Sequence, residues 1–225
     1  VSLAGINRKS AVLIGAAGTG KTTTQRAVCS ALIDSGIGIL DSQGHKHLQS
    51  GTPAIVICAY TRRAVANIRK NLPLDLQANA ITIHKLLEYQ PTYYEVQDPV
   101  TGETKNTMKF EAARNSANPL PSSIRCIIFE ESSMIGTDLY QEVQDALPHS
   151  PQQIFLGDIQ QLPPVFGPAI LGFKLLELPV IELTEVYRQA LESPIISLAH
   201  RILSGRPVEA KEFPSFKVPN QLTLH

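Results

Sequence analysis

The residues best suited to chemistry lie in a glycine-rich segment, residues 15–22, with the sequence Gly-Ala-Ala-Gly-Thr-Gly-Lys-Thr. This spacing matches G-x-x-x-x-G-K-[ST], in which backbone N–H groups wrap phosphate oxygens and the next helix N-terminus adds positive potential. We expect Lys21 to contact the β- and γ-phosphates of ATP, and the Thr22 hydroxyl to ligate Mg²⁺. The expected nucleotide-binding residues are Gly15, Ala16, Ala17, Gly18, Thr19, Gly20, Lys21, Thr22 and Thr23.

Two carboxylates follow an apolar run later in the chain. Residues 127–129 are Ile-Ile-Phe, and Glu130 and Glu131 come directly after them. A phosphate-binding loop needs a metal-holding carboxylate at the end of a neighbouring strand, so we expect Glu130 to hold Mg²⁺ or its waters. Glu131 would orient and deprotonate the attacking water. Solvent-exposed acids at a strand end are the alternative, which loses weight in a chain that also carries the loop.

A third candidate group lies in residues 157–165, Gly-Asp-Ile-Gln-Gln-Leu-Pro-Pro-Val, directly after another apolar run. An amide side chain at this edge of a sheet can contact a γ-phosphate and respond to its loss. The alternative is a proline-stiffened loop whose amides face solvent. The spacing alone does not decide between the two.

Hydrophobic patterning predicts the elements that position these residues. Short apolar runs predict buried strands near residues 11–14, 54–59, 125–129, 154–156 and 180–183, and residues 81–83 are expected to form a strand end. Helical spacing predicts helices over residues 21–34, from 64 toward Pro73, and near 137–147 and 194–203. Strands separated by helices predict an α/β fold with a mostly parallel sheet that is covered on both faces.

One region departs from this alternation. Residues 92–97 and 104–110 are rich in aromatic and β-branched residues, and the Asp-Pro-Val-Thr-Gly-Glu segment between them supplies turn geometry. The pattern predicts a β-hairpin inserted in the α/β domain, with residues 115–123 as the linker back.

Composition limits the class of protein. Apolar residues make up 43% and charged residues 18% of the 225 residues, so a packed core is expected and wholesale disorder is excluded. The sequence has no apolar run near the ~18 residues of a membrane span and no leader-like opening, so we expect no membrane partner. Cys29, Cys58 and Cys126 cannot all pair and form no C-x-x-C, which favours a reduced, cytoplasmic setting. His45 and His47 lack ligands at zinc-like spacing, which favours a loop surface.

The net charge of zero hides an asymmetry along the chain. Residues 1–75 carry nine Lys and Arg against three Asp and Glu, whereas residues 76–225 carry eleven against seventeen. A neutral total therefore does not exclude a polyanionic ligand, because binding depends on the local field. Charge spread evenly around the surface remains the alternative.

Six motifs together resemble those of the superfamily 1 DNA helicases, most closely the RecD-like and phage Dda-like 5′→3′ branch. The motifs occur in the family's order and cover about residues 10–205. Besides the phosphate-binding loop they are residues 59–64 (motif Ia), 82–87 (Ib), 130–134 (II), 157–165 (III) and 183–189 (IV). The resemblance implies a RecA-like ATPase domain.

The resemblance also implies roles for single residues. Gln161 occupies the position of the γ-phosphate sensor and Arg188 that of the arginine finger. Thr61, Arg62 and His84 fall where such helicases touch single-stranded DNA.

The hairpin lies where this family inserts its small 1B domain, whose pin splits the duplex. Tyr93 and Tyr94 could stack on bases there, and ordinary hairpin packing is an equally open interpretation. We expect residues 1–88 and 120–205 to form the ATPase domain, 89–119 the hairpin subdomain, and 206–225 a linker toward a second RecA-like domain.

One departure concerns motif II, because Glu130 stands where the family has Asp. The extra methylene can be accommodated if the metal contact runs through water. The second wall of the nucleotide cleft is expected to lie outside these 225 residues, so the isolated chain would bind nucleotide weakly and not unwind DNA.

The expected function is that of a DNA helicase motor portion, which couples hydrolysis of Mg-ATP to movement on single-stranded DNA and to unwinding. Single-stranded and fork DNA are the expected partners, with replication or recombination proteins, in a bacterial or phage-infected cell. Two alternatives stay open. One is an ATPase subunit of a RecD-type helicase–nuclease complex, and the other is a nucleotide-gated module that binds single-stranded DNA without translocating.

Overall fold

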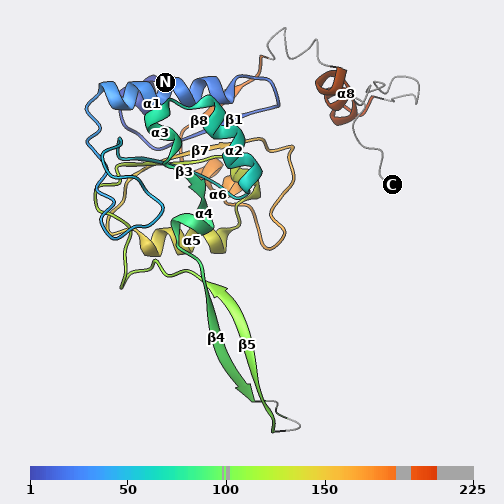
Figure 1. The fold of residues 1–225 in the computed structure, drawn as a ribbon. Helices are drawn as coiled ribbons and strands as arrows, with labels where there is room; N and C mark the ends of the chain where they lie inside the picture. Colours follow the sequence, from blue (N-terminus) through green and yellow to red (C-terminus); the bar gives the residue numbers. More distant parts are fainter. Residues whose placement is uncertain (98, 100–101, 186–193, 207–225) are drawn as a thin grey trace, which may run out of the picture.

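A six-stranded sheet forms the centre of the protein, and a separate two-stranded hairpin projects from it (Figure 1). The computed structural model describes residues 1–97, 99, 102–185 and 194–206. The strands of the central sheet are β1 (Ala11–Gly15), β2 (Ile55–Ala59), β3 (Ala80–Thr82), β6 (Cys126–Phe129), β7 (Gln152–Gly157) and β8 (Val180–Leu183). Their order is β3-β2-β6-β7-β1-β8 and every pairing is parallel, which confirms the predicted α/β fold class.

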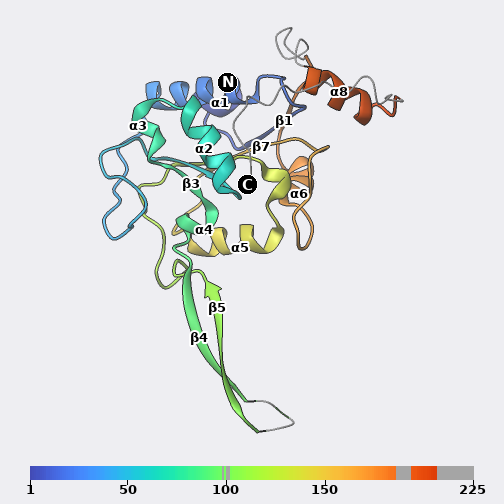
Figure 2. The same cartoon turned by 45° about the vertical axis from the view of Figure 1, so that its right-hand side comes forward.

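Helices cover both faces of the sheet, as Figures 1 and 2 show. The helical elements are η1 (Ser2–Ile6), α1 (Lys21–Asp34), α2 (Arg62–Asn71), α3 (Leu74–Gln77), α4 (Ile83–Leu86), η2 (Ser132–Met134), α5 (Thr137–Ala146), α6 (Ile170–Glu177) and α8 (Pro194–Leu203). Successive strand residues point to opposite faces. Leu13 therefore packs with α1, α2 and α3, whereas Val12 and Ile14 pack with α4, α5 and α6.

The metal-binding expectation assumed a neighbouring strand, and the sheet order corrects this assumption. Strand β6, which precedes Glu130, is not paired with β1, because β7 lies between them. The registers Ala11↔Ile154 and Ile128↔Ile154 nevertheless place the three carboxyl ends at one edge. Patterning also missed α6, in which Gly172 interrupts the helical apolar residues that follow a proline-rich loop.

The hairpin consists of β4 (Gln90–Gln97) and β5 (Thr104–Glu111), paired antiparallel with Tyr93 opposite Met108. Both views show it extending away from the sheet on the side of α4 and α5 (Figures 1 and 2). Nearly all of its residues are exposed, so its direction depends on the residues where it joins the domain.

Two further observations concern the chain's surroundings. No helix in the described part of the chain is long and apolar enough to cross a membrane. Cys29, Cys58 and Cys126 are free and buried, and burial raises the pKa of the Cys29 thiol to about 12.

Candidate functional site

The polar residues singled out by the sequence gather at the carboxyl edge of the sheet. The glycine-rich loop follows β1, Glu130 follows β6 and Asp158 follows β7. Thr61 and His84 follow β2 and β3 at the same edge. Ligands of open parallel sheets bind at this edge, because the loops leaving the strands converge there.

The loop between β1 and α1 has the backbone geometry that a phosphate cradle requires. Gly18 and Gly20 have φ angles of 82° and 91°, in the left-handed region that glycine adopts without strain. Lys21 Nζ donates hydrogen bonds to the carbonyl oxygens of Gly15 and Ala16, at 2.6 and 3.1 Å. The lysine side chain therefore folds back over the loop, where a bound phosphate group would meet it.

The loop is also packed too closely to tolerate larger residues. A Cβ added to Gly15 would lie 2.5 Å from Thr19 Oγ1 and 2.9 Å from the carbonyl oxygen of Leu183. Thr19, itself buried, donates from its hydroxyl to the carbonyl oxygen of Ala16 at 2.9 Å. Gly15 therefore lies in close contact with Thr19 and with Leu183 of β8, and no larger residue fits at this position.

Glu130 is buried and unusually basic. Burial, helped by the charge of Glu131, raises the pKa of Glu130 to about 7, and the Lys21 ammonium acts in the opposite direction. Glu131 is partly exposed, and its φ of 53° lies in the left-handed region. Its side chain therefore points in a different direction from that of a residue continuing strand β6. Ser132 secures this turn by donating to the carbonyl oxygen of Leu156 at 2.8 Å.

These residues fit a magnesium ion. A nearby cation stabilises the charged form of a buried carboxylate whose pKa is raised, as that of Glu130 is. Thr22 lies in the first turn of α1, directly after Lys21, whose charge already acts on Glu130. Mg²⁺ commonly takes one or two protein oxygens and completes its shell with water and phosphate. Among the described residues there is no group of three or more His, Cys, Asp and Glu side chains that could hold a metal ion.

A cleft of about 320 Å³ opens beside the loop. Gly15, Ala16 and Thr19 line it on one side, and residues at the ends of β7 and β8 line it on the other: Asp158, Ile159, Gln160, Glu182, Leu183 and Thr184. Gln161, the expected γ-phosphate sensor, is exposed and does not line this cleft. The adjacent Gln160 does, and nothing in the sequence pattern distinguished the two amides. Arg188 lies outside the described residues.

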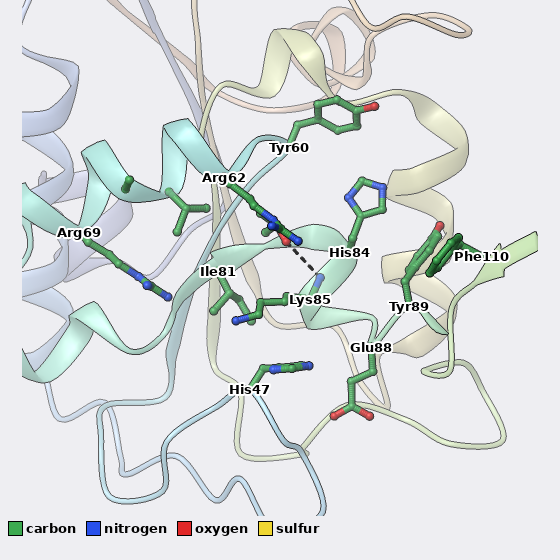
Figure 3. A pocket seen from close by; sticks show the side chains of 13 residues that line it. His47, Tyr60, Arg62, Arg69, Ile81, His84, Lys85, Glu88, Tyr89 and Phe110 are labelled. Atoms are coloured by element: carbon green, nitrogen blue, oxygen red, sulfur yellow. Dashed lines mark hydrogen bonds between the residues drawn. The ribbon is translucent and has the colours of Figure 1, made fainter. Parts of the chain in front are cut away.

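A larger groove of about 750 Å³ lies at the carboxyl ends of β2 and β3. In Figure 3 the cations Arg62, Arg69 and Lys85 lie on one side of it. The rings on the other side are those of Tyr60, His84, Tyr89 and Phe110. A polyanion whose backbone follows the cations would thus place its apolar groups against rings.

The rings on the aromatic side pack against one another. His84 lies edge-on between Tyr60 and Tyr89, with ring-centroid separations of 5.6 and 4.9 Å. Burial lowers the pKa of His84 below its ordinary value, although the charge of Glu142 acts against this shift. A neutral His84 therefore presents a ring rather than a charge at pH 7.

Of the three residues expected to bind DNA, two line this groove and the third, Thr61, caps the helix that carries Arg62. Arg62 and His84 line the groove directly. Thr61 caps α2 by accepting a hydrogen bond from the Ala64 N–H at 3.1 Å, so it sets the direction in which Arg62 leaves the helix. Sequence reasoning missed Arg69, although its position two helical turns after Arg62 places both on one helix face.

The structure places Tyr93 and Tyr94 on opposite faces of the hairpin, as alternation along a strand requires. Tyr93 shares its face with Met108 and Phe110, and Phe110 lines the groove. Tyr94 lies on the other face, where its hydroxyl donates to Glu111 and Lys109 lies over its ring. Tyr93 is 70% and Tyr94 39% exposed, so the first has the freer ring.

The parallel sheet, the phosphate-binding loop and the paired carboxylates define a P-loop nucleotide-binding domain. Residues 3–167 match the model of the AAA domain family, and the chain belongs to that family.

Among curated proteins, the ATP-dependent RecD2 DNA helicase of Deinococcus radiodurans has a similar sequence. It is 33% identical over 198 residues, which are 86% of this chain and 22% of the helicase. This similarity confirms the resemblance to RecD-like helicases that the motifs indicated. The chain spans about a fifth of the length of that relative.

Two solved structures resemble the chain more distantly. A double mutant of the Pif1 helicase from Bacteroides has 20% identity and a TM-score of 0.46, covering 94% of this chain and 46% of that one. The Pif1 helicase from Candida albicans has 16% identity and a TM-score of 0.49, covering 96% and 47%.

Proposed function

We propose that this chain is the motor portion of a DNA helicase, which hydrolyses ATP with Mg²⁺ and uses the cycle to move along single-stranded DNA. One observation carries the proposal. A P-loop with its two carboxylates and a groove with a cationic and an aromatic side open at the same edge of one sheet. Movement of loops around a nucleotide would therefore act directly on a strand in the groove.

The chain's own residues supply most of the hydrolysis step. Backbone N–H groups of residues 15–20 and the start of α1 would hold the phosphates, and Lys21 would exchange its bonds to the Gly15 and Ala16 carbonyls for phosphate oxygens. Glu131 would accept the proton of the attacking water, and Gln161 and Arg188 would contact the γ-phosphate. The role of Gln161 requires its loop to turn toward the cleft, where Gln160 lies in this structure.

Thr22 and Glu130 would hold the magnesium ion, which neutralises charge that develops on the phosphate oxygens. The long Glu130 side chain makes contact through water reasonable at this position. Because its folded-state pKa lies near 7, the side chain has to lose its proton before it serves as a ligand.

Single-stranded DNA fits the groove better than a protein or a small anion does. Arg62, Arg69 and Lys85 would contact phosphates, and the rings of Tyr60, His84 and Tyr89 would contact bases. A charged backbone with apolar rings along one side has this combination of features. We propose fork DNA and proteins of replication or recombination as the wider partners, and the three free buried cysteines support a cytoplasmic location.

The test measures ATP hydrolysis by the whole protein, with and without single-stranded DNA. We expect DNA to stimulate the wild-type rate, and Lys21→Ala to reduce the stimulated rate by about 10²-fold or more, because a charge on the phosphates is lost. Lys9→Ala is the matched control, since Lys9 is an exposed lysine that precedes β1 at the far edge of the sheet. A Lys21→Ala variant as active as Lys9→Ala would remove the P-loop from the mechanism.

A further inference from the structure

The two ends of the hairpin meet in a group of polar residues around the buried Arg114, outside the nucleotide cleft. Arg114, which is 7% exposed, donates from Nε to Glu88 Oε2 at 3.1 Å. Its Nη1 donates to Asn118 Oδ1 at 3.2 Å and to the Pro119 carbonyl oxygen at 3.1 Å, and its Nη2 donates to the carbonyl oxygen of Gly44. Every nitrogen of the guanidinium has an acceptor, and the acceptors come from three separate segments.

Glu88 is the other charged member of this group. It lies between α4 and β4 with a φ of 51°, in the left-handed region, and its Oε1 accepts the Lys46 N–H at 2.9 Å. Burial acts to raise the pKa of Glu88, but the Lys46 N–H and Arg114 outweigh it, and the pKa lies below its ordinary value. The pair is therefore an ion pair at neutral pH, and the strained backbone of Glu88 is held by its side-chain contacts.

Backbone hydrogen bonds join the same segments. The N–H groups of Ala113 and Arg114 both donate to the carbonyl oxygen of Leu87, at 3.0 and 3.1 Å. The segment before β4 and the segment after β5 are thus fastened to each other and to the loop around residues 44–46. We call this group the hairpin root; its members are Gly44, Lys46, Glu88, Arg114 and Asn118.

The hairpin root determines where the hairpin points. Beyond it, both strands are exposed along almost their whole length and extend away from the domain (Figure 2). Glu88 belongs to the root and also lines the groove. Tyr89, just before β4, and Phe110, near the end of β5, line the same groove. The angle between groove and hairpin is therefore fixed at the root.

We propose that Arg114 is a positioning residue for strand separation, which holds the hairpin at a fixed angle to the groove so that a duplex approaching the groove meets it in one place. The proposal rests on the proposed function. Arg114 does not line the groove, so its action runs through Glu88 and the hairpin and not through contact with nucleic acid. Only the planar guanidinium group of arginine can donate hydrogen bonds to acceptors on three segments at once.

The test compares Arg114→Lys with Arg125→Lys in the whole protein. Lysine keeps the charge at position 114 but cannot reach the acceptors on all three segments together. Arg125 is exposed and lies before β6 at the far edge of the sheet, so the same substitution there is a matched control. Asn118→Ala is a second, milder variant, because Asn118 is exposed and its loss removes only one acceptor of Arg114.

Three quantities are measured for each variant: affinity for a single-stranded oligonucleotide, DNA-stimulated ATP hydrolysis, and base pairs of fork DNA separated per ATP. We expect Arg114→Lys to keep the affinity for single-stranded DNA and the rate of ATP hydrolysis within about twofold. The number of base pairs separated per ATP should fall by about tenfold, because a small displacement of a positioned group can cost a factor of up to about 10² in the step that it positions. Asn118→Ala should lower the third measure by a smaller factor, and Arg125→Lys should change none.

The hairpin's position is measured directly with spin labels at Asn106→Cys on β5 and Asp138→Cys on α5. The native cysteines are buried, so labelling is selective for the two new thiols. Arg114→Lys should broaden the distance distribution, and Arg125→Lys should not.

An unchanged distribution with unchanged base pairs per ATP would overturn the proposal. So would a parallel loss of all three activities, which describes a residue that only stabilises the fold. If the wild-type protein neither hydrolyses ATP in response to DNA nor separates strands, the proposed function itself fails and this proposal with it.

Discussion

At the scale of single residues, the burial of Glu130 determines the pKa of its carboxyl group and therefore the pH at which the carboxylate could serve as a Mg²⁺ ligand. It follows β6 and is 8% exposed. Its folded-state pKa is about 7, against 4.5 for an ordinary glutamate. Between these values the folded protein binds a proton that the unfolded chain does not bind. The free energy of unfolding therefore falls as pH rises from about 4.5 to 7, and the loss persists above pH 7.

Glu130→Gln should remove this dependence. Relative to wild type, the variant should gain about 3 kcal/mol of stability between pH 5 and pH 8, because a neutral amide has no charge to bury. Urea unfolding without nucleotide and without Mg²⁺ measures the difference, and Glu95→Gln is the control, since Glu95 is exposed on the hairpin strand β4. A gain that is the same at both pH values would mean that the Glu130 carboxylate is not desolvated.

The sequence predicted the glycine-rich loop more completely than the residues that line the groove. The loop of residues 15–22 is one contiguous segment whose geometry follows from its glycines, so its pattern identifies it directly. The groove is assembled from residues of several segments, from His47 to Phe110, and the ring packing of His84 with Tyr89 depends on where the chain turns after α4. The choice between Gln160 and Gln161 depends on a loop conformation that spacing does not encode.

At the scale of elements, the buried strands were predicted well because each is a short apolar run between polar segments. Strand β8 was also expected to be buried, but it lies at the edge of the sheet and its Val180 and Glu182 are exposed. The hairpin was also predicted, from its turn residues and aromatic flanks. Its register was not, and the register decides which tyrosine shares a face with the groove residue Phe110: Tyr93 pairs with Met108 on that face.

This register leads to a prediction. Tyr93→Ala in the whole protein should weaken binding of a single-stranded oligonucleotide by about tenfold, since stacking of one base on a ring contributes about 1–3 kcal/mol. Tyr94→Ala should change binding by less than about twofold, because the Tyr94 ring lies on the opposite face against Lys109. Fluorescence anisotropy gives both affinities. Equal effects of the two substitutions would show that the hairpin does not present one face to the strand.

At the scale of the whole molecule, the structure shows where part of the positive charge of the first 75 residues lies. The first 75 residues have the excess of Lys and Arg, and two of these residues, Arg62 and Arg69, line the groove together with Lys85. Ion release from a bound strand then makes affinity depend on salt, with a slope set by the number of phosphate contacts.

Lys85→Ala should reduce the slope of log affinity against log salt concentration by about 0.7, the value for one contact to a single strand. Lys70 is the matched control, because it is exposed on α2 but does not line the groove. Binding titrations between roughly 50 and 200 mM salt measure both slopes, since affinity for nucleic acid changes steeply over this interval. An unchanged slope for Lys85→Ala would place the strand elsewhere on the surface.

The order of strands in the sheet also bears on the order of events during synthesis. Strand β1, which carries the phosphate-binding loop, lies between β7 and β8, and its residue Val12 pairs with Phe155 and Val180. Both neighbours come much later in the chain than β1, at residues 152–157 and 180–183. Until β7 and β8 have been made, both edges of the apolar strand β1 lack a hydrogen-bonding partner. Unpaired apolar strands favour aggregation and binding by chaperones. The strand that carries the phosphate-binding loop therefore gains its two neighbours only after β7 and β8 have been made.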